Sequence, residues 1–318
     1  MIKAGIAGCQ GLSASELIRI LINHPDVELK WVADATHSGV RLDRIIPGIV
    51  GECELTVSGE CDLADVDLVL LCDTRDKVAT WLRTHDVPPG VKLIDVSGCH
   101  NQDADAGGPW VYGMSEMQRR VLVHEAQWVT VPGPAAVASL LAVMPVARSH
   151  KLDTPLSLLL TAGDRVLQAA GLAVDKPIPQ AWVDEQEQEL RHALSQCQPG
   201  FSQPVSLTMA TSAEHRLITV TARFKSDMDQ DSLKSLYQQY YEDHNFVFLM
   251  DRPIVAADVE NTNKCLLRLS RHDENGEITV LGVMDGLLKA GVGNAVHAMN
   301  LMFGLYERIG LTLKASGC

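Results

Sequence analysis

The chain has 318 residues, of which 46% are hydrophobic and 21% are charged, and its formal net charge at pH 7 is −13. This length accommodates two domains with separate cores, and the composition is that of a globular protein rather than a disordered one. The negative charge argues against nucleic acid as a partner, because phosphate backbones require clustered cations, so a small-molecule substrate is expected.

The N-terminal residues show no basic segment followed by an apolar core, so no signal peptide is expected. No apolar run reaches the roughly 18 residues of a membrane span, and no membrane association is expected. The eight cysteines are scattered without a CxxC pair. This pattern is typical of reduced thiols in a cytoplasmic protein and predicts no metal site.

A glycine-rich turn follows a short apolar strand at residues 3–7. Gly5, Gly8 and Gly11 are spaced three residues apart, and a helix is expected to begin near Ser13. Such a turn lets the backbone approach a pyrophosphate, whose charge is stabilised by the helix N-terminus. The residues expected to bind a dinucleotide here are Gly5, Gly8, Cys9, Gln10, Gly11 and Leu12.

The next apolar run, residues 27–34, ends in Asp34, at about the twenty-residue distance at which an acid accepts hydrogen bonds from an adenosine ribose. An acid at this place repels a 2′-phosphate, which favours NAD over NADP as the cofactor. The alternative interpretation is that Asp34 only caps the loop that follows the strand.

Two more apolar runs, residues 66–73 and 90–98, are typical of buried parallel strands, and they flank a helix expected at residues 76–85. Alternating strands and helices predict an α/β fold, a Rossmann-type doubly wound parallel sheet. The dinucleotide-binding domain is expected to span residues 1–145.

The pattern changes after about residue 152, where several apolar runs alternate in polarity along the chain. Helices are expected at residues 184–197 and 231–244. The expected strands are residues 152–163, 205–211, 215–224, 264–271 and 277–285. Alternating strands predict an antiparallel sheet with one exposed face, in an α+β domain over residues 146–292.

The chain ends in a glycine turn and an apolar helix, expected over residues 293–318. One interpretation is a helix that serves packing alone. The other is that the helix packs back on the first domain while its turn approaches the cofactor. On that interpretation, the cofactor-binding residues are Lys289, Gly293 and Asn294.

Three stretches carry a resemblance to a known family: GIAGCQGLSASEL, VYGMSE with VPGPAAVASLLAV, and DGLLKAGVGNAVHAMNLMFGL. The chain resembles the N-acetyl-gamma-glutamyl-phosphate reductase family of the semialdehyde dehydrogenase superfamily. The resemblance implies a second domain like that of glyceraldehyde-3-phosphate dehydrogenase, which binds substrate and forms a homodimer or homotetramer. It also implies an NADP-dependent reduction of an acyl phosphate in arginine biosynthesis, in which a cysteine thiolate attacks and a histidine assists.

This chain departs from the family pattern at the residues of that chemistry. The family's Pro-Gly-Cys turn is here Pro132, Gly133 and Pro134, and proline cannot act as a nucleophile. The family's His-Arg-His segment corresponds to residues 180–182, with Gln180 and Trp182 in place of the histidines. Neither side chain can transfer a proton near neutral pH.

Two cationic positions of the family are also changed. Asn101 replaces an arginine that is a candidate substrate contact, and Asp34 with Ala35 replaces a Ser-Arg pair next to the 2′-phosphate. These losses favour a divergent NAD(P)-dependent oxidoreductase that acts on another carbonyl or on an imine. The alternative is a non-catalytic dinucleotide-binding homologue, a sensor or a partner subunit.

The catalytic residues are therefore unknown at this stage. Cys99 is a candidate for a relocated nucleophile, although a lone cysteine is more often a small buried hydrophobe. His100, Tyr112, Glu116 and Lys289 are candidate proton donors by position only. Direct hydride attack on an acyl phosphate is disfavoured, because the thioester splits one difficult displacement into two easier ones.

Overall fold

The computed structural model describes residues 1–102, 104, 108–272 and 275–315. The chain forms two compact units, each with its own sheet. Unit 1 comprises residues 1–132 and 291–312, and unit 2 comprises residues 133–290 and the residues after 312. The expected boundary near residue 145 falls inside helix α5 (Pro134–Arg148), which packs on helices and strands of unit 2.

Unit 1 contains a parallel sheet of six strands in the order β2-β1-β3-β4-β6-β5, which confirms the predicted Rossmann-type fold. The strands are β1 (Ile2–Ala7), β2 (Val27–Ala33), β3 (Leu68–Leu71), β4 (Lys92–Asp95), β5 (Trp110–Tyr112) and β6 (Trp128–Thr130). The helices of this unit are α1 (Gly11–Leu21), α2 (Leu42–Ile45), α3 (Arg75–Thr84), α4 (Ser115–His124) and α9 (Gly293–Met302).

The register of this sheet brings the carboxyl ends of its strands to one edge. Ala7 pairs with Ala33 and with Leu71, and Leu71 pairs with Asp95. The strand order reverses at β1, because β2 lies on one side of β1 and β3 on the other. Ligands of open α/β sheets bind at such a reversal, outside the carboxyl ends of the strands.

Two helix boundaries in unit 1 differ from the sequence expectations. Helix α1 begins at Gly11 rather than near Ser13, because Gly11 adopts a φ of +86° that turns the chain directly into the helix. Helix α9 ends at Met302, so the expected helix over residues 293–318 was too long. The left-handed Gly304, with a φ of +67°, and the Leu305 N–H, which donates to the Asn300 carbonyl, terminate the helix.

Unit 2 contains a mixed sheet in the order β10-β11-β12-β9-β7-β8. Its strands are β7 (Leu156–Gly163), β8 (Val205–Ser212), β9 (Leu217–Lys225), β10 (Val247–Leu249), β11 (Cys265–His272) and β12 (Glu277–Asp285). The sheet is not purely antiparallel as expected, because β8 runs parallel to β7 and β10 parallel to β11. Helix α7 (Gln180–Cys197) lies between β7 and β8 in the chain and provides the crossover that a parallel pair requires.

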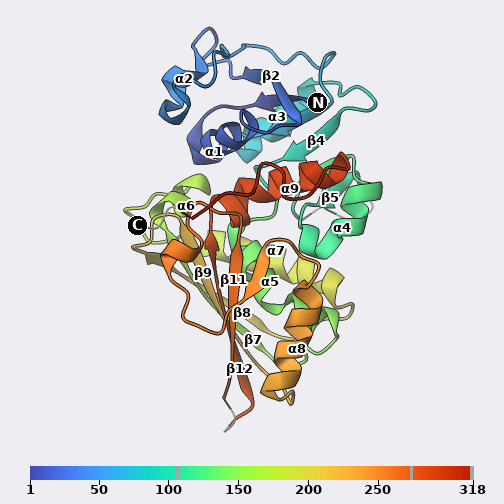
Figure 1. Cartoon of the computed structure of the whole chain (residues 1–318), viewed down its shortest axis with the longest axis vertical. Helices are drawn as coiled ribbons and strands as arrows, with labels where there is room; N and C mark the ends of the chain where they lie inside the picture. The colour runs from blue at the N-terminus through green and yellow to red at the C-terminus, as the bar shows by residue number, and fades with distance from the viewer. Residues whose placement is uncertain (103, 105–107, 273–274, 316–318) are drawn as a thin grey trace. The chain divides into compact units, whose positions relative to one another are not determined.

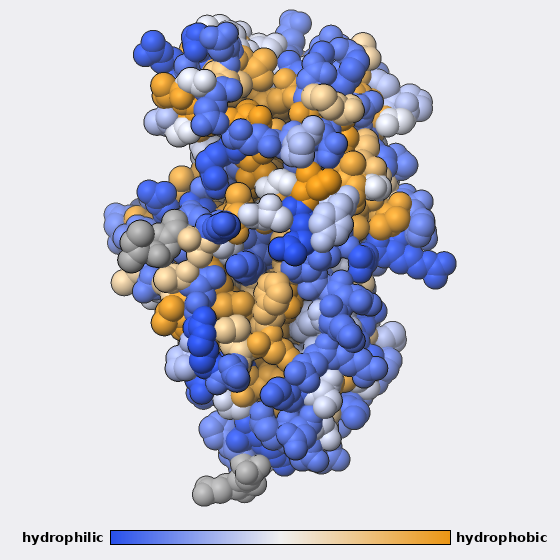
Figure 2. Space-filling view, viewed as in Figure 1, coloured by the Kyte–Doolittle hydropathy of each residue, from blue (hydrophilic) through white to orange (hydrophobic). Residues whose placement is uncertain are grey.

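Helices α5, α7 and α8 (Gln230–Tyr241) pack on the sheet of unit 2 (Figure 1), while the shorter α6 (Asp164–Ala169) follows β7. The hydroxyl groups of Tyr237 and Tyr241 each donate to a carbonyl of α5 at 2.6 Å, which ties α8 to α5. Along β7, buried residues alternate with exposed ones, including Leu159. Figure 2 shows apolar side chains gathered over the strands of this unit. Within the described residues, no helix is long and apolar enough to cross a membrane.

Candidate functional site

A cavity of about 510 Å³ lies at the carboxyl ends of β1, β2 and β3, at the point where the strand order of unit 1 reverses. Ala7 and Gly8 line it from β1, and Ala33 and Asp34 line it from β2. The glycine turn and the strand that ends at Asp34 predicted a ligand site at this end of the sheet. Residues 59–61 also line the cavity, but their loop has no local sequence pattern that indicates a ligand.

The glycine turn that borders the cavity has no room for side chains at two of its positions. A Cβ atom on Gly8, whose φ is +101°, would lie 2.4 Å from the carbonyl oxygen of Cys72. A Cβ atom on Gly5 would lie 2.2 Å from the ring of Trp31. Gly8 therefore permits the left-handed backbone that leads to Gly11 at the start of α1, while Gly5 permits close packing between β1 and β2. Leu12 is the second residue of α1 and is half-buried.

Asp34 is 8% exposed and is held by a network of donors at the end of β2. Thr36 donates to Oδ1 through its backbone N–H at 2.9 Å and its hydroxyl at 2.6 Å, and Gln10 Nε2 donates to Oδ2 at 3.0 Å. Burial raises the pKa of the Asp34 carboxyl, but the hydrogen bonds from Thr36, Gln10 and Cys9 outweigh burial and bring the pKa well below its ordinary value. The carboxylate is therefore ionised at neutral pH.

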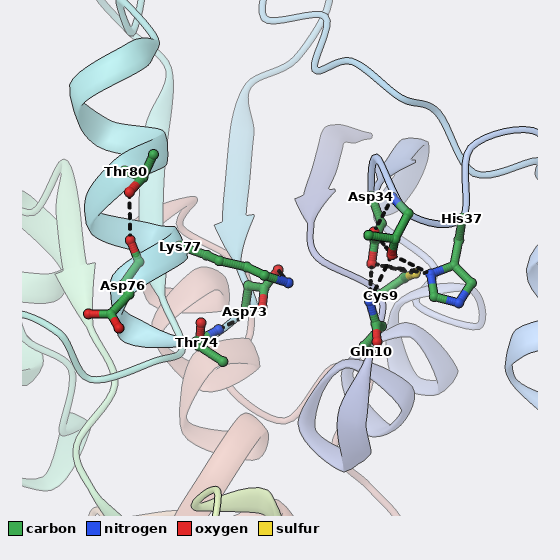
Figure 3. Close-up of polar contacts among 10 residues, drawn as sticks. Cys9, Gln10, Asp34, His37, Asp73, Thr74, Asp76, Lys77 and Thr80 are labelled. Atoms are coloured by element: carbon green, nitrogen blue, oxygen red, sulfur yellow. Dashed lines mark hydrogen bonds and ion pairs between the residues drawn. The ribbon is translucent and has the colours of Figure 1, made fainter.

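The side chains of Cys9 and His37 both lie next to the Asp34 carboxylate (Figure 3). The thiol of Cys9 lies 3.4 Å from Asp34 Oδ2, and His37 Nδ1 lies 3.6 Å from that oxygen. Burial raises the pKa of the Cys9 thiol to about 12, and the negative charge of Asp34 adds to this shift. The thiol is therefore protonated at neutral pH and acts as a donor to Asp34.

The opposite wall of the cavity is formed mainly by α3. Val78, Trp81 and His85 line it, and the rings of Trp81 and His85 stack with centroids 4.5 Å apart. Lys77 also lines the cavity and pairs with Asp73 at 3.0 Å (Figure 3). This side of the cavity thus combines two stacked flat rings with a cation that is paired with a carboxylate.

At the end of β4, a buried carboxylate orients a histidine. Asp95 is fully buried, and its Oδ2 atom lies 3.0 Å from Nδ1 of His100. The His100 ring also stacks on Trp110, with centroids 4.1 Å apart. The His100 side chain keeps 17% exposure, so it is accessible from solvent. Of the candidate proton donors, His100 is the one that the structure holds on a carboxylate and leaves partly exposed.

The other candidates of this unit have different surroundings. Cys99 is half-buried, and its backbone N–H donates to the hydroxyl of Ser97. Asn101 is 2% exposed and accepts a hydrogen bond from the hydroxyl of Thr130 at 2.6 Å. Tyr112 is 1% exposed at the end of β5. The buried Asn101 side chain thus contacts Thr130 at the end of β6.

Glu116 is also buried, and it belongs to a series of hydrogen-bonded polar side chains that no sequence pattern predicted. Ser115 donates to Glu116 at 3.1 Å and lies 2.8 Å from Nδ1 of His297, while Nε2 of His297 lies 2.7 Å from Glu307. Ser115, Glu116, His297 and Glu307 are all at most 5% exposed. This series of side chains connects α4 with α9 and with the turn that follows α9.

In unit 2, the nucleophile turn of the predicted family leads into α5. Pro134 is the first residue of the helix, where its missing N–H costs no hydrogen bond. Glu189, from α7, accepts the backbone N–H of Gly133 at 2.9 Å. Gln186 is 2% exposed, and its Oε1 atom has no hydrogen-bond partner among the residues that the structure describes. Both side chains lie against Gly133, because a Cβ atom there would be 2.7 Å from Gln186 and 3.0 Å from Glu189.

The remaining predicted positions lie in separate elements. Gln180 begins α7 and donates to Asp184 at 2.8 Å, and Trp182 is half-buried in the same turn. Lys289 is fully buried in unit 2, with its ammonium group 5.8 Å from the ring centroid of Phe246. The other two predicted contacts at the C-terminal turn are Gly293 and Asn294, which begin α9 in unit 1 and are buried.

Comparison with known proteins agrees with this arrangement. Residues 3–124 match the NAD-binding domain of semialdehyde dehydrogenase, and residues 183–286 match its dimerisation domain. Aspartate semialdehyde dehydrogenase II from Vibrio cholerae superposes with a TM-score of 0.74 at 14% identity, over 96% of this chain and 99% of that chain. Aspartate semialdehyde dehydrogenase with NADP from Candida albicans superposes with a TM-score of 0.72 at 13% identity, over 97% and 99% of the two chains. The chain is a two-domain protein of the semialdehyde dehydrogenase class.

Full-length relatives define the family more narrowly. N-acetyl-gamma-glutamyl-phosphate reductases from Parabacteroides distasonis and Phocaeicola vulgatus are 32% and 33% identical to the chain, each over 99% of both sequences. The chain belongs to the N-acetyl-gamma-glutamyl-phosphate reductase family, and the predicted resemblance is confirmed.

Proposed function

We propose that this protein is an NAD(H)-dependent oxidoreductase that reduces a carbonyl compound or an imine without a thioester intermediate. One observation carries the proposal: unit 1, which matches an NAD-binding domain, has a cavity at the carboxyl ends of its strands, whereas the turn of unit 2 that corresponds to the family's nucleophile begins its helix with Pro134. Hydride transfer requires orientation and a proton donor, but it does not require a covalent nucleophile.

The cavity of unit 1 fits the adenosine end of NAD. Gly8 allows the backbone to approach a pyrophosphate, and Asp34 offers an ionised carboxylate to the ribose hydroxyl groups. The same charge repels a 2′-phosphate, and the nearby Lys77 is already paired with Asp73. These features favour NAD over NADP. When NAD(H) is bound, it supplies the hydride chemistry.

His100 is the residue of unit 1 that is best placed to supply a proton. Its Nδ1 atom is held by the buried carboxylate of Asp95, and Trp110 fixes the plane of its ring. A carboxylate on Nδ1 sets the orientation and the tautomer of the imidazole, which leaves Nε2 to give or take the proton. His100 and Asp95 therefore form a proton-transfer pair in this proposal.

A homo-oligomer in the cytoplasm is part of the proposal. The match of residues 183–286 to a dimerisation domain and the partly exposed strand β7 in unit 2 support self-association. None of the seven cysteines that the structure describes forms a disulfide, which is consistent with a reducing compartment.

The contact between Glu189 and Gly133 favours a second function, that of a dinucleotide-binding protein without catalytic turnover. The backbone N–H at the start of α5 is taken by a carboxylate of the chain itself, so this helix end is not available to a substrate anion. A dinucleotide-binding sensor or partner subunit without turnover would tolerate this arrangement.

Cofactor titration followed by turnover assays separates the two functions. NADH and NADPH binding is measured by fluorescence, and turnover is then tested with N-acetyl-gamma-glutamyl phosphate and with a panel of carbonyl compounds and imines. Tight NADH binding, with reduction of a panel compound but not of the acyl phosphate, supports the oxidoreductase. NADH binding without any turnover favours the second function. Binding of neither cofactor contradicts both, and rapid acyl-phosphate reduction contradicts the role assigned to Pro134.

A further inference from the structure

Three side chains with metal-binding atoms converge at the carboxyl end of β2, on the rim of the cofactor cavity (Figure 3). They are Cys9 from the glycine turn, Asp34 from the end of β2 and His37 from the loop that follows. One ligand atom of each residue lies within 4.8 Å of those of the other two. A thiol, an imidazole and a carboxylate are the three ligand types that zinc uses in proteins.

Two of the three distances between these atoms resemble those between the ligands of a bound zinc ion, and the third, between Cys9 and His37, is at most 4.8 Å. Ligands at about 2.0–2.3 Å from a tetrahedral zinc lie roughly 3.3–3.5 Å from one another. Asp34 Oδ2 lies 3.4 Å from the thiol of Cys9 and 3.6 Å from Nδ1 of His37. The His37 side chain is one-third exposed, and its Nδ1 atom lies 2.9 Å from the hydroxyl of Thr36, a contact that coordination of a cation would replace.

We propose that Cys9, Asp34 and His37 form a binding site for a zinc-class divalent cation, and that this cation and NAD(H) exclude each other. Soft thiolate and imidazole ligands favour zinc or cobalt over magnesium and calcium. The sequence pattern predicted no metal site, because Cys9 is separated from the other two ligands by the whole of α1 and β2. Three protein ligands leave a fourth position for water.

Cation binding exchanges the thiol proton of Cys9 for a metal–sulfur bond. The thiol donates to Asp34 Oδ2 at 3.4 Å. Binding replaces the S–H bond with a metal–sulfur bond and releases that proton to solvent, with no change in oxidation state.

The exclusion of NAD(H) follows from the shared carboxylate and rests on the proposed function. Asp34 Oδ2 is the carboxylate oxygen that lies beside both Cys9 and His37, and Asp34 is the residue assigned to the ribose. An oxygen that coordinates a cation cannot at the same time accept the ribose hydroxyl groups in the same geometry. Bound metal is thus expected to weaken NADH binding, and bound NADH to weaken metal binding by the same factor.

Cobalt(II) titration of the full-length protein tests the metal site, because a cobalt–thiolate bond gives a charge-transfer band in the near ultraviolet. We expect this band at one cobalt per chain, its displacement by zinc, and the release of one proton per metal. Cys9→Ser removes the band, and His37→Ala weakens cobalt binding by at least about tenfold. The control is Cys61→Ser, which removes another thiol that lines the cavity and leaves the band unchanged.

The metal-site proposal is contradicted if the natural protein shows no cobalt–thiolate band. It is also contradicted if the Cys9→Ser variant still shows that band. Neither result depends on NADH, so the cobalt titration tests the metal site even if the proposed function is wrong. The exclusion is tested by measuring NADH affinity with and without saturating zinc in the natural protein. An NADH affinity that zinc leaves unchanged overturns the exclusion.

Discussion

The side chain of Glu189 accepts the backbone N–H of Gly133 at 2.9 Å, directly before Pro134 begins α5. In the family mechanism this helix start would carry a thiolate, whose pKa a helix N-terminus lowers. Here the positive end of the helix dipole faces a carboxylate, which opposes ionisation of any thiol placed nearby.

A cysteine restored at this turn is therefore expected to be a poor nucleophile. In the Pro134→Cys variant, reaction of the new thiol with iodoacetamide at neutral pH should be slow. Adding Glu189→Gln removes the charge and should speed the reaction about tenfold, which corresponds to one unit of thiol pKa. The measurement is the rate of labelling of the introduced thiol in peptide digests. Equal rates in the single and double variants would show that Glu189 does not act on this helix start.

The cofactor preference depends on the charge of Asp34. Asp34→Ala is expected to weaken NADH binding by about tenfold to a hundredfold, because hydrogen bonds to a charged acceptor contribute about 1.5–3 kcal/mol. NADPH binding should be affected less, since the repulsion of the 2′-phosphate disappears, so the gap between the two affinities narrows. Fluorescence titration measures both constants, and the control is Asp76→Asn, which removes an exposed carboxylate of α3 that does not line the cavity. Equal NADH and NADPH affinities in the natural protein would refute the assignment.

The proton-transfer pair makes a prediction that separates catalysis from binding. Once a substrate is identified, His100→Gln should lower kcat by about a hundredfold to ten-thousandfold, the usual contribution of a general acid. NADH affinity should stay within about twofold, because no part of the cofactor site depends on a charge at this position. His124→Gln at the end of α4 serves as the control. If His100→Gln retains full kcat, the proton comes from another group.

The buried thiol of Cys72 is expected to lower the free energy of unfolding at alkaline pH. Burial, aided by the charges of Asp73 and Asp95, raises the pKa of Cys72 from its ordinary value of 9.0 to about 12. Because the unfolded chain ionises this thiol first, the contribution of Cys72 to stability is complete below pH 9 and is lost as the pH rises toward 12. The free energy of unfolding should fall by up to about 1.4 kcal/mol per pH unit for this thiol.

Urea unfolding at a series of alkaline pH values measures this loss. The Cys72→Ala variant should be less stable at neutral pH, because a cavity replaces the sulfur, but its stability should fall less steeply with pH. The control is Cys53→Ala, which removes a thiol that the fold leaves partly exposed. Identical slopes in the natural protein and in Cys72→Ala would contradict the prediction.

Local sequence patterns predicted most of the elements. Glycine spacing, apolar runs and their alternation depend on neighbouring residues, so the strands around the cavity and the long strands of unit 2 were found from the sequence. Strands β5 and β6 were missed because three residues carry too little periodicity. The parallel pairing of β8 with β7 was also missed, because pairing direction depends on the path of the chain between strands.

The sequence by itself determined that no thiolate can stand at position 134, because proline carries no thiol in any surroundings. Only the tertiary structure decided which groups meet: Glu189 with Gly133 across 56 residues, Asp34 with Cys9 across 25, and Ser115 with His297 across 182. Such contacts arise when the sheet register aligns strand ends and helices pack on them. The distances between these groups then set the charge, protonation and ligand-binding capacity of each site.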